Sequence, residues 1–211
     1  MPYSLRLVED TLAPGARYAP PPGSTAGVFY LAEGGLCGEA GAAVLPDAGG
    51  APLARAGTIA GPQGARLLRF ELVREPAHAP EGRVLLEQLM DLDPRASWLL
   101  RCDRVDFERG AVAPRHGHRG GGIRCLLRGR LEVTVGDAPT RAIGPGDAWF
   151  ESGREPVLAV ASQDEDTSFI RVAVLPAEIR GRSSIVYVDP ADAARARPRT
   201  YTVFVDEPIS L

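Results

Sequence analysis

Short apolar runs alternate with glycine and proline along the whole chain. The runs are rich in β-branched and aromatic side chains, as in Gly27–Leu31, Arg66–Val73, Leu131–Val135 and Phe169–Val174. Such side chains favour strands, whereas glycine and proline favour turns. Many short strands separated by turn residues are typical of a β-sandwich or β-barrel. The pattern therefore predicts an all-β fold.

Three segments call for separate interpretation. Residues 84–90 are compatible with a short helix or with a strand. Residues 190–197 begin at Asp189-Pro190, which predicts a helix N-cap followed by a proline in the first turn. The alternating segment 201–208 predicts a strand far from its own unit, so we expect it to pair with the first unit or with a partner subunit. Exchange of such a strand is a route to a homodimer, which we therefore expect.

The sequence contains an internal repeat. Gly15 and Gly34 bound one segment, and Gly110 and Gly129 bound another of equal length. Inside these segments Gly27-Val28 aligns with Gly122-Ile123 and Leu31 aligns with Leu126, while further on Leu68–Phe70 aligns with Ile170–Val172. The repeat predicts two similar β units over residues 1–75 and 76–180, followed by a C-terminal extension over residues 181–211.

Composition excludes several classes of protein. The net charge is −3 with an isoelectric point near 5.7, which argues against nucleic-acid binding. No apolar run approaches the roughly 20 residues that a membrane helix needs, and the N-terminus lacks an apolar signal-peptide core. The three cysteines, Cys37, Cys102 and Cys125, are widely scattered, so we expect no disulfide framework and a cytoplasmic location.

Two of the three histidines lie one residue apart, at His116 and His118. Side chains at positions i and i+2 of a strand point to the same face, so both imidazoles can converge on one ion. Neutral imidazoles suit divalent transition metals. Taken alone, the pair is equally compatible with two histidines that bind no metal.

The segment that begins at Gly110 resembles the first sequence motif of the cupin superfamily. That motif is a glycine, five residues, His-x-His, three or four residues, a glutamate, six residues and a glycine, and Gly110, His116, His118 and Gly129 fall in register with it. Residues 142–151 resemble the start of the second motif, in which a Pro-Gly-Asp turn leads into a strand.

The resemblance covers residues 104–176 well and residues 10–75 weakly, through the repeat. It implies two tandem cupin (jelly-roll-type) β-barrels, a bicupin with a degenerate N-terminal barrel. Pro21 and Gly23 occupy the histidine positions of that barrel, so we expect it to hold no metal.

The second barrel departs from the family pattern at two metal-ligand positions. Gly122 stands where the resemblance implies a glutamate, and Val157 stands where it implies a histidine, with Ser152 at the usual proline position. Glu151 is a candidate third ligand or general base. Alternatively, Glu151 pairs with Arg154 or Arg128, or faces solvent. His78 is a further candidate ligand, although its proline- and alanine-rich surroundings favour an exposed position.

Three residues are candidates for contact with a substrate. Arg124 shares the parity of His116 and His118 if the strand is regular, and could then bind a carboxylate or phosphate. If the glycines at 120–122 break the register, Arg124 points outward instead. Trp149 and Phe150 are expected to pack in the core, with one of them at the pocket mouth.

Three functions stay open at this point. The first is an enzyme that uses one divalent ion (Fe, Mn, Ni or Zn) on His116 and His118 and acts on a small anionic organic molecule, with Glu151 as a ligand or base. The second is a metal-free barrel that binds a small molecule without catalysis. The third is a structural scaffold whose pocket is filled by side chains. A bound metal with an open coordination position distinguishes the first from the second.

Overall fold

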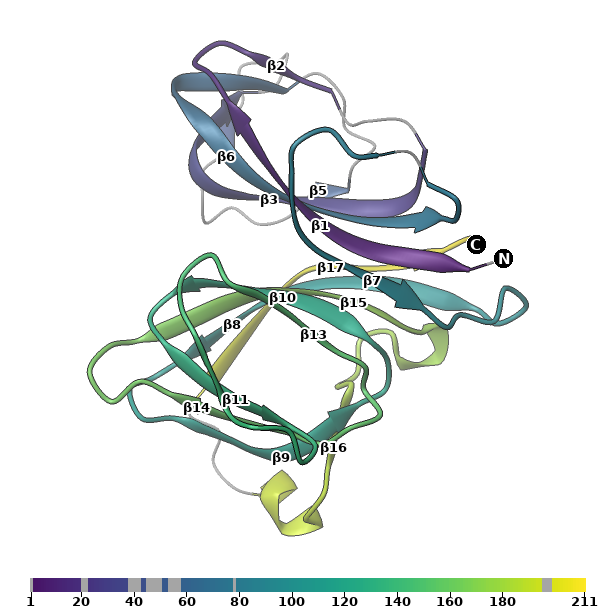
Figure 1. Ribbon diagram of the computed structural model, residues 1–211, viewed down its shortest axis with the longest axis vertical. Helices are drawn as coiled ribbons and strands as arrows, with labels where there is room; N and C mark the ends of the chain where they lie inside the picture. Colours follow the sequence, from purple (N-terminus) through teal and green to yellow (C-terminus); the bar gives the residue numbers. More distant parts are fainter. Residues whose placement is uncertain are drawn as a thin grey trace. The chain divides into compact units, whose positions relative to one another are not determined.

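The computed structural model describes residues 2–19, 23–37, 43–44, 51–52, 58–77, 79–194 and 199–211. Pro21 and His78 therefore lie outside the described residues. The chain divides into two compact units, residues 1–94 with 210–211, and residues 95–209. Strands dominate both units (Figure 1), and the described helices are two short 3₁₀ turns. The all-β prediction is confirmed, and no described helix is long and apolar enough to cross a membrane.

The first unit is built around one antiparallel sheet. Its strands follow the order β4-β3-β6-β1-β7, with β2 paired to β6 and β5 paired to β3. Their bounds are β1 Tyr3–Leu12, β2 Arg17–Tyr18, β3 Ser24–Cys37, β4 Ala43–Val44, β5 Ala51–Pro52, β6 Thr58–Arg74 and β7 Arg83–Met90. Residues 84–90, which the sequence left between helix and strand, thus form a strand that pairs with β1.

The second unit contains two five-stranded sheets. One has the order β13-β10-β15-β8-β17 and the other β12-β11-β14-β9-β16. The bounds are β8 Trp98–Phe107, β9 Val112–His118, β10 Gly122–Arg128, β11 Leu131–Val135, β12 Arg141–Ile143, β13 Ala148–Glu151, β14 Val157–Ala161, β15 Thr167–Pro176, β16 Ile185–Tyr187 and β17 Arg199–Ile209. The 3₁₀ turns are η1 Ala177–Ile179 and η2 Pro190–Ala194. Residues from both sheets form a shared apolar cluster, as expected when two sheets enclose a core.

The sequence repeat corresponds to a repeated arrangement of strands. The order β3-β6-β1-β7 in the first unit matches β10-β15-β8-β17 in the second. The glycines that bound the repeat adopt matching left-handed conformations, with φ of 73° at Gly15 and 68° at Gly110, and 80° at Gly34 and 77° at Gly129. Only glycine takes up such angles readily, so the same turns recur at the same places in both units.

The structure divides the chain at a different point from the predicted boundary. The predicted first unit ends at residue 75, whereas the first compact unit continues to residue 94 because β7 pairs with β1. The expected helix over 190–197 is the shorter 3₁₀ turn η2, with residues 195–198 outside the described part.

The C-terminal strand does not pair with the first unit among the described residues, as one of the two expectations had it. β17 pairs with β8 of the second unit, from Arg199 opposite Phe107 to Ile209 opposite Trp98. β15 covers only one edge of β8, so the other edge has unpaired backbone groups that β17 satisfies. The preceding strand β16 completes the edge of the other sheet by pairing with β9. Residues 181–209 are therefore part of the second barrel.

Candidate functional site

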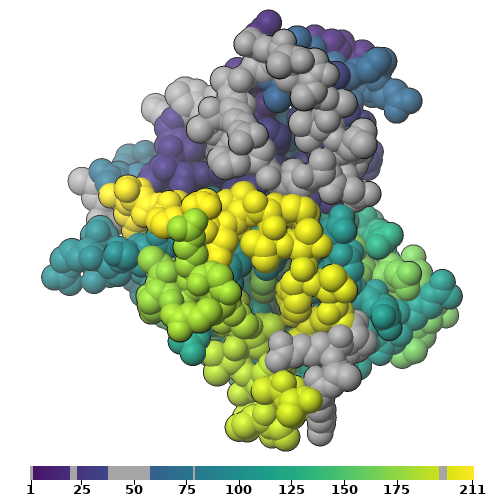
Figure 2. Space-filling view, turned by 180° about the vertical axis from the view of Figure 1, so that it is seen from behind, coloured from purple at the N-terminus to yellow at the C-terminus, as the bar shows by residue number. Residues whose placement is uncertain are grey.

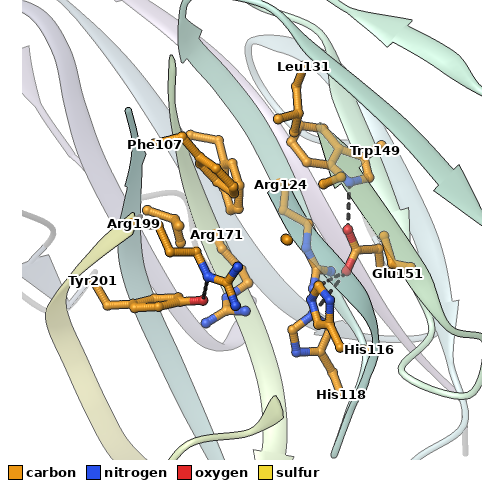
Figure 3. Close-up of a pocket in the computed structure, with 15 residues that line it drawn as sticks. Phe107, His116, His118, Arg124, Leu131, Trp149, Glu151, Arg171, Arg199 and Tyr201 are labelled. Carbon is orange, nitrogen blue, oxygen red and sulfur yellow. Dashed lines mark hydrogen bonds and ion pairs between the residues drawn. The ribbon is translucent and has the colours of Figure 1, made fainter. Parts of the chain in front are cut away.

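A cavity opens inside the second unit and is lined from both sheets (Figure 3). The empty space between the lining residues is about 370 Å³, a figure that includes open solvent at the mouth. The lining residues are Val105, Phe107, Ala113, His116, His118, Arg124, Leu131, Trp149, Glu151, Val157, Ala159, Phe169, Arg171, Arg199 and Tyr201.

His116 and His118 lie on the same face of β9, as their spacing predicts. Their ring centroids are 4.9 Å apart and both side chains are buried. His116 Nδ1 lies 2.7 Å from the carbonyl of Pro114, so it carries the hydrogen and leaves Nε2 as an acceptor. Burial lowers the pKa of His116, so its imidazole is neutral at neutral pH.

Glu151 is the centre of a buried network of side chains. Its Oε2 lies 2.7 Å from Arg124 Nη2 and 3.2 Å from His118 Nε2, and its Oε1 accepts a 2.8 Å hydrogen bond from Trp149 Nε1. Glu151 therefore neither faces solvent nor pairs with Arg154 or Arg128, the alternatives that the sequence had left open. Glu151 is ion-paired with Arg124 inside the barrel.

Burial and pairing together fix the charges in this network. Burial alone would raise the pKa of Glu151, but the Arg124 guanidinium and the hydrogen bond from His118 hold that pKa well below its usual range. Burial lowers the pKa of Arg124 to about 10, so Arg124 stays cationic at neutral pH. Burial also lowers the pKa of His118 to about 3, despite the opposing hydrogen bond to Glu151. His118 is therefore a neutral hydrogen-bond donor to Glu151 and not its ion-pair partner.

Arg124 points into the cavity, so the glycines before it do not turn it outward. Its guanidinium is fully buried and also donates a 2.5 Å hydrogen bond from Nη1 to the carbonyl of Gly122. A side chain at Gly122 has no room, because a Cβ there would lie 2.6 Å from the Val172 carbonyl oxygen and 2.8 Å from Ala173. The glutamate that the family resemblance implies at position 122 is thus sterically excluded.

The donor set does not fit a divalent metal ion. Val157 lies directly opposite His116 in the β14–β9 pair and supplies no ligand atom. His118 Nε2 is engaged with Glu151, and the same carboxylate is neutralised by Arg124. Among the described residues, no group of three or more histidine, cysteine, aspartate or glutamate side chains is arranged to hold a metal. Catalytic metal sites typically have about three protein ligands, and a buried guanidinium beside them would repel the ion.

The remaining predicted contact residues lie on opposite faces of β13. Trp149 lines the cavity and belongs to the core cluster, with its ring 5.3 Å from that of Phe169. Phe150 is not brought to the cavity, because alternation along β13 directs Trp149 and Glu151 inward and Phe150 to the other face.

Three polar lining residues were missed by reasoning from the sequence. Arg171 is buried on β15 and binds Asp103 through two hydrogen bonds, at 2.9 and 2.5 Å. The repeat aligned Arg171 with Arg69, which is likewise buried and ion-paired with Asp10 and Glu71, and this match was an available signal. Arg199 and Tyr201 belong to β17, which we had placed outside this barrel.

Comparison with known proteins shows which solved structures share this fold. No family model and no curated protein matches the sequence. A variant of oxalate decarboxylase from Bacillus subtilis is similar in structure, with a TM-score of 0.54 at 13% identity over 94% of this chain and 81% of that one. A second oxalate decarboxylase structure gives a TM-score of 0.53 at 14% identity over 88% of this chain and 71% of that one. A conserved protein of unknown function from Pseudomonas aeruginosa gives 0.51 at 10% identity over 82% of both chains.

At such identities the likeness shows the fold alone. The protein has an all-β fold of the cupin type, with jelly-roll β-barrel architecture. Within that fold, the pocket of the second unit holds a guanidinium–carboxylate pair beside the two histidines.

Proposed function

We propose that the second unit binds a small organic anion without a metal ion, in the cavity that Arg124, Arg171 and Arg199 line. The observation that carries this proposal is the 2.7 Å ion pair between Arg124 and Glu151, adjoining His118. The Glu151 carboxylate could otherwise bind a metal cation, but the Arg124 guanidinium already neutralises it. Of the functions considered from the sequence, this geometry favours the metal-free binding protein.

The charges of the lining support an anionic ligand. Arg124, Arg171 and Arg199 contribute three positive charges, and Glu151 contributes one negative charge. Outside the lining, Asp103 neutralises Arg171. With both histidines neutral, the group retains one uncompensated positive charge. A positive charge held in a low-dielectric cavity attracts anions more strongly than the same charge in water.

Two further features belong to this proposal. The shared strand order and matched glycines support a first unit that is a degenerate copy of the second barrel. Oxalate decarboxylase, by its name, acts on a small organic anion, and it shares this fold. The homodimer and the cytoplasmic location stay predictions, of which light scattering on the purified protein tests the first.

The decisive experiment measures metal content and anion binding on the same untagged protein. We expect the wild type to retain well under one metal ion per chain after incubation with Fe²⁺, Mn²⁺, Ni²⁺ or Zn²⁺ and gel filtration. Small carboxylates should raise its melting temperature, because a ligand that binds only the folded state stabilises it. Near-stoichiometric metal in the wild type that is lost in His116→Ala/His118→Ala would overturn the proposal in favour of the metal-dependent enzyme.

A further inference from the structure

Of the three guanidiniums that line the cavity, only Arg199 is not paired with a carboxylate among the described residues. Arg124 binds Glu151, and Arg171 binds Asp103 in bidentate fashion. The described contacts of Arg199 are with phenol oxygens, from Nε to Tyr201 at 2.5 Å and from Nη2 to Tyr187 at 2.8 Å. Arg199 is nevertheless buried, with 9% of its surface exposed. A buried cation usually has a carboxylate partner, so its counter-charge is expected to come from a ligand.

Arg199 lies where the edges of the two sheets approach each other. Its own strand β17 is the edge of one sheet, and Tyr187 lies on β16 at the edge of the other. The hydrogen bond between them links the sheets at the cavity. Tyr187 also pairs with His116 across β16 and β9, and the two rings are 6.1 Å apart. Arg199 lowers the pKa of His116 in addition to the larger effect of burial, which places its charge within reach of the histidines.

The hydroxyl of Tyr201 is suited to a second contact with an anion. Because the oxygen accepts the Arg199 Nε–H, its own hydrogen is left to donate. Burial raises the pKa of Tyr201, against the opposing effect of Arg199, so the hydroxyl keeps that hydrogen at neutral pH. Figure 3 shows the Tyr201 hydroxyl meeting the Arg199 guanidinium, which is directed toward the interior of the site.

The part of the lining next to Arg199 is aromatic. Phe107, Trp149 and Phe169 form contiguous aromatic contacts, with centroid distances of 6.0 Å for Phe107–Phe169 and 5.3 Å for Trp149–Phe169. Phe107 is the residue directly opposite Arg199 in the β8–β17 pair. A ligand whose charged group contacts Arg199 would therefore place its body against aromatic and aliphatic side chains. Such a surface favours an apolar body, because a hydroxyl placed against these rings would lose its hydration without finding a hydrogen-bond partner there.

We propose that Arg199 binds the carboxylate of a monocarboxylic acid with a compact apolar or aromatic body, assisted by the Tyr201 hydroxyl. This inference rests on the proposed function and specifies its ligand. One uncompensated positive charge matches one carboxylate, whereas a dicarboxylate would bring a second negative charge toward Glu151. The C-terminal strand, seen in yellow at the surface of the second unit in Figure 2, thereby supplies the ligand-binding group of the barrel.

The test is isothermal titration of the full chain with benzoate and 3-methylbutanoate. Benzamide serves as the uncharged match of benzoate, while succinate, oxalate and inorganic phosphate serve as anions without an apolar body. We expect the two monocarboxylates to bind more tightly than every other probe. Arg199→Gln should weaken benzoate binding roughly 10- to 100-fold, the range for a charge-assisted hydrogen bond. Arg141→Gln, at an exposed position of β12, should leave it unchanged.

Tyr201→Phe keeps the ring and removes only the hydroxyl, so it tests the site even if Arg199→Gln fails to fold. We expect it to weaken benzoate binding several-fold, as for one neutral hydrogen bond of about 0.5–1.5 kcal/mol. Equal affinity for benzoate in the wild type and in folded Arg199→Gln would overturn the role of Arg199. Preference for oxalate or succinate would overturn the ligand class while leaving the proposed function in place, whereas preference for inorganic phosphate would overturn both. Failure of every anion to bind would overturn both.

Discussion

Replacement of Arg124 by methionine tests whether the guanidinium compensates the buried charge of Glu151. Glu151 is 6% exposed, and Arg124 is the cation that contacts its carboxylate. The substitution leaves that carboxylate with two neutral donors, His118 and Trp149. Removal of one partner from a buried ion pair typically costs about 3–5 kcal/mol, because the remaining charge is buried without compensation. We expect Arg124→Met to destabilise the second unit by about this amount.

The double variant Arg124→Met/Glu151→Gln separates lost charge compensation from lost packing. It removes both charges and keeps a side chain of similar size at each position. We expect it to recover most of the stability lost in Arg124→Met, because replacement of both partners of a buried ion pair is often close to neutral. Arg141→Met provides the control for loss of an exposed arginine in the same unit, with an expected change within about 0.5 kcal/mol.

Urea denaturation followed by tryptophan fluorescence can report on the second unit alone. The chain has two tryptophans, Trp98 and Trp149, and both lie within residues 95–209. The free energy of unfolding is obtained by linear extrapolation to zero denaturant. A loss of less than about 1 kcal/mol in Arg124→Met, or a double variant no more stable than Arg124→Met, would refute the reasoning.

Three further predictions concern the same unit. Gly122→Ala should destabilise it by roughly 1–3 kcal/mol in the urea assay, because the added Cβ would clash with the backbone of β15. The control variant Gly144→Ala should leave the stability unchanged, because the atom nearest to its Cβ is 3.6 Å away. Asp206→Asn should destabilise it by about 1–3 kcal/mol at pH 7 by removing the carboxylate that Arg101 contacts. Burial alone would raise the pKa of Asp206, but Arg101 and the Gly181 amide lower it, so this stabilisation is present above the unfolded pKa near 3.8 and is lost as pH falls through the folded pKa. The difference in free energy of unfolding between wild type and Asp206→Asn should therefore become smaller as the pH is lowered. A difference that grows on acidification would contradict the stabilising role of the Asp206 carboxylate. Arg124→Met/Val157→His should bind Zn²⁺ near-stoichiometrically in a chelator competition, because it frees Glu151 and adds an imidazole opposite His116. The control variant Arg124→Met/Val160→His should not bind Zn²⁺, because Val160 lies on the other face of β14.

Local sequence patterns were sufficient for the class of fold and for part of the site. Alternation along a strand correctly placed His116 and His118 on one face, and the same parity argument gave the inward position of Arg124 as one of two alternatives. The equal spacing of glycines revealed the repeated units, because turns that require a positive φ impose glycine at fixed positions. These inferences depend on residues close together in the sequence, where the geometry of a strand or turn is known in advance.

The remaining features depend on which strands meet after folding. Arg199 joins the cavity only because β17 pairs with β8, and these strands are nearly a hundred residues apart in the chain. Nothing in the alternation of residues 201–208 states which edge the strand will join. Likewise, the choice of Arg124 as the partner of Glu151, over Arg128 or Arg154, follows from the pairing of β10 with β13. Sequence reasoning could propose these partners but could not select among them.

The position of Arg199 on an edge strand links ligand binding to hydrogen exchange in the C-terminal segment. Edge strands are held on one side only, and segments of this kind tend to open locally at lower free energy than central strands. Opening of β17 from β8 would carry Arg199 and Tyr201 away from the cavity, so the opened form could not hold a ligand at Arg199. A ligand bound there should therefore slow amide exchange along β17 by the factor 1 + [L]/Kd, while amides of the first unit keep their rates. The rate of amide exchange along β17 would thus measure the fraction of chains with a ligand bound at Arg199.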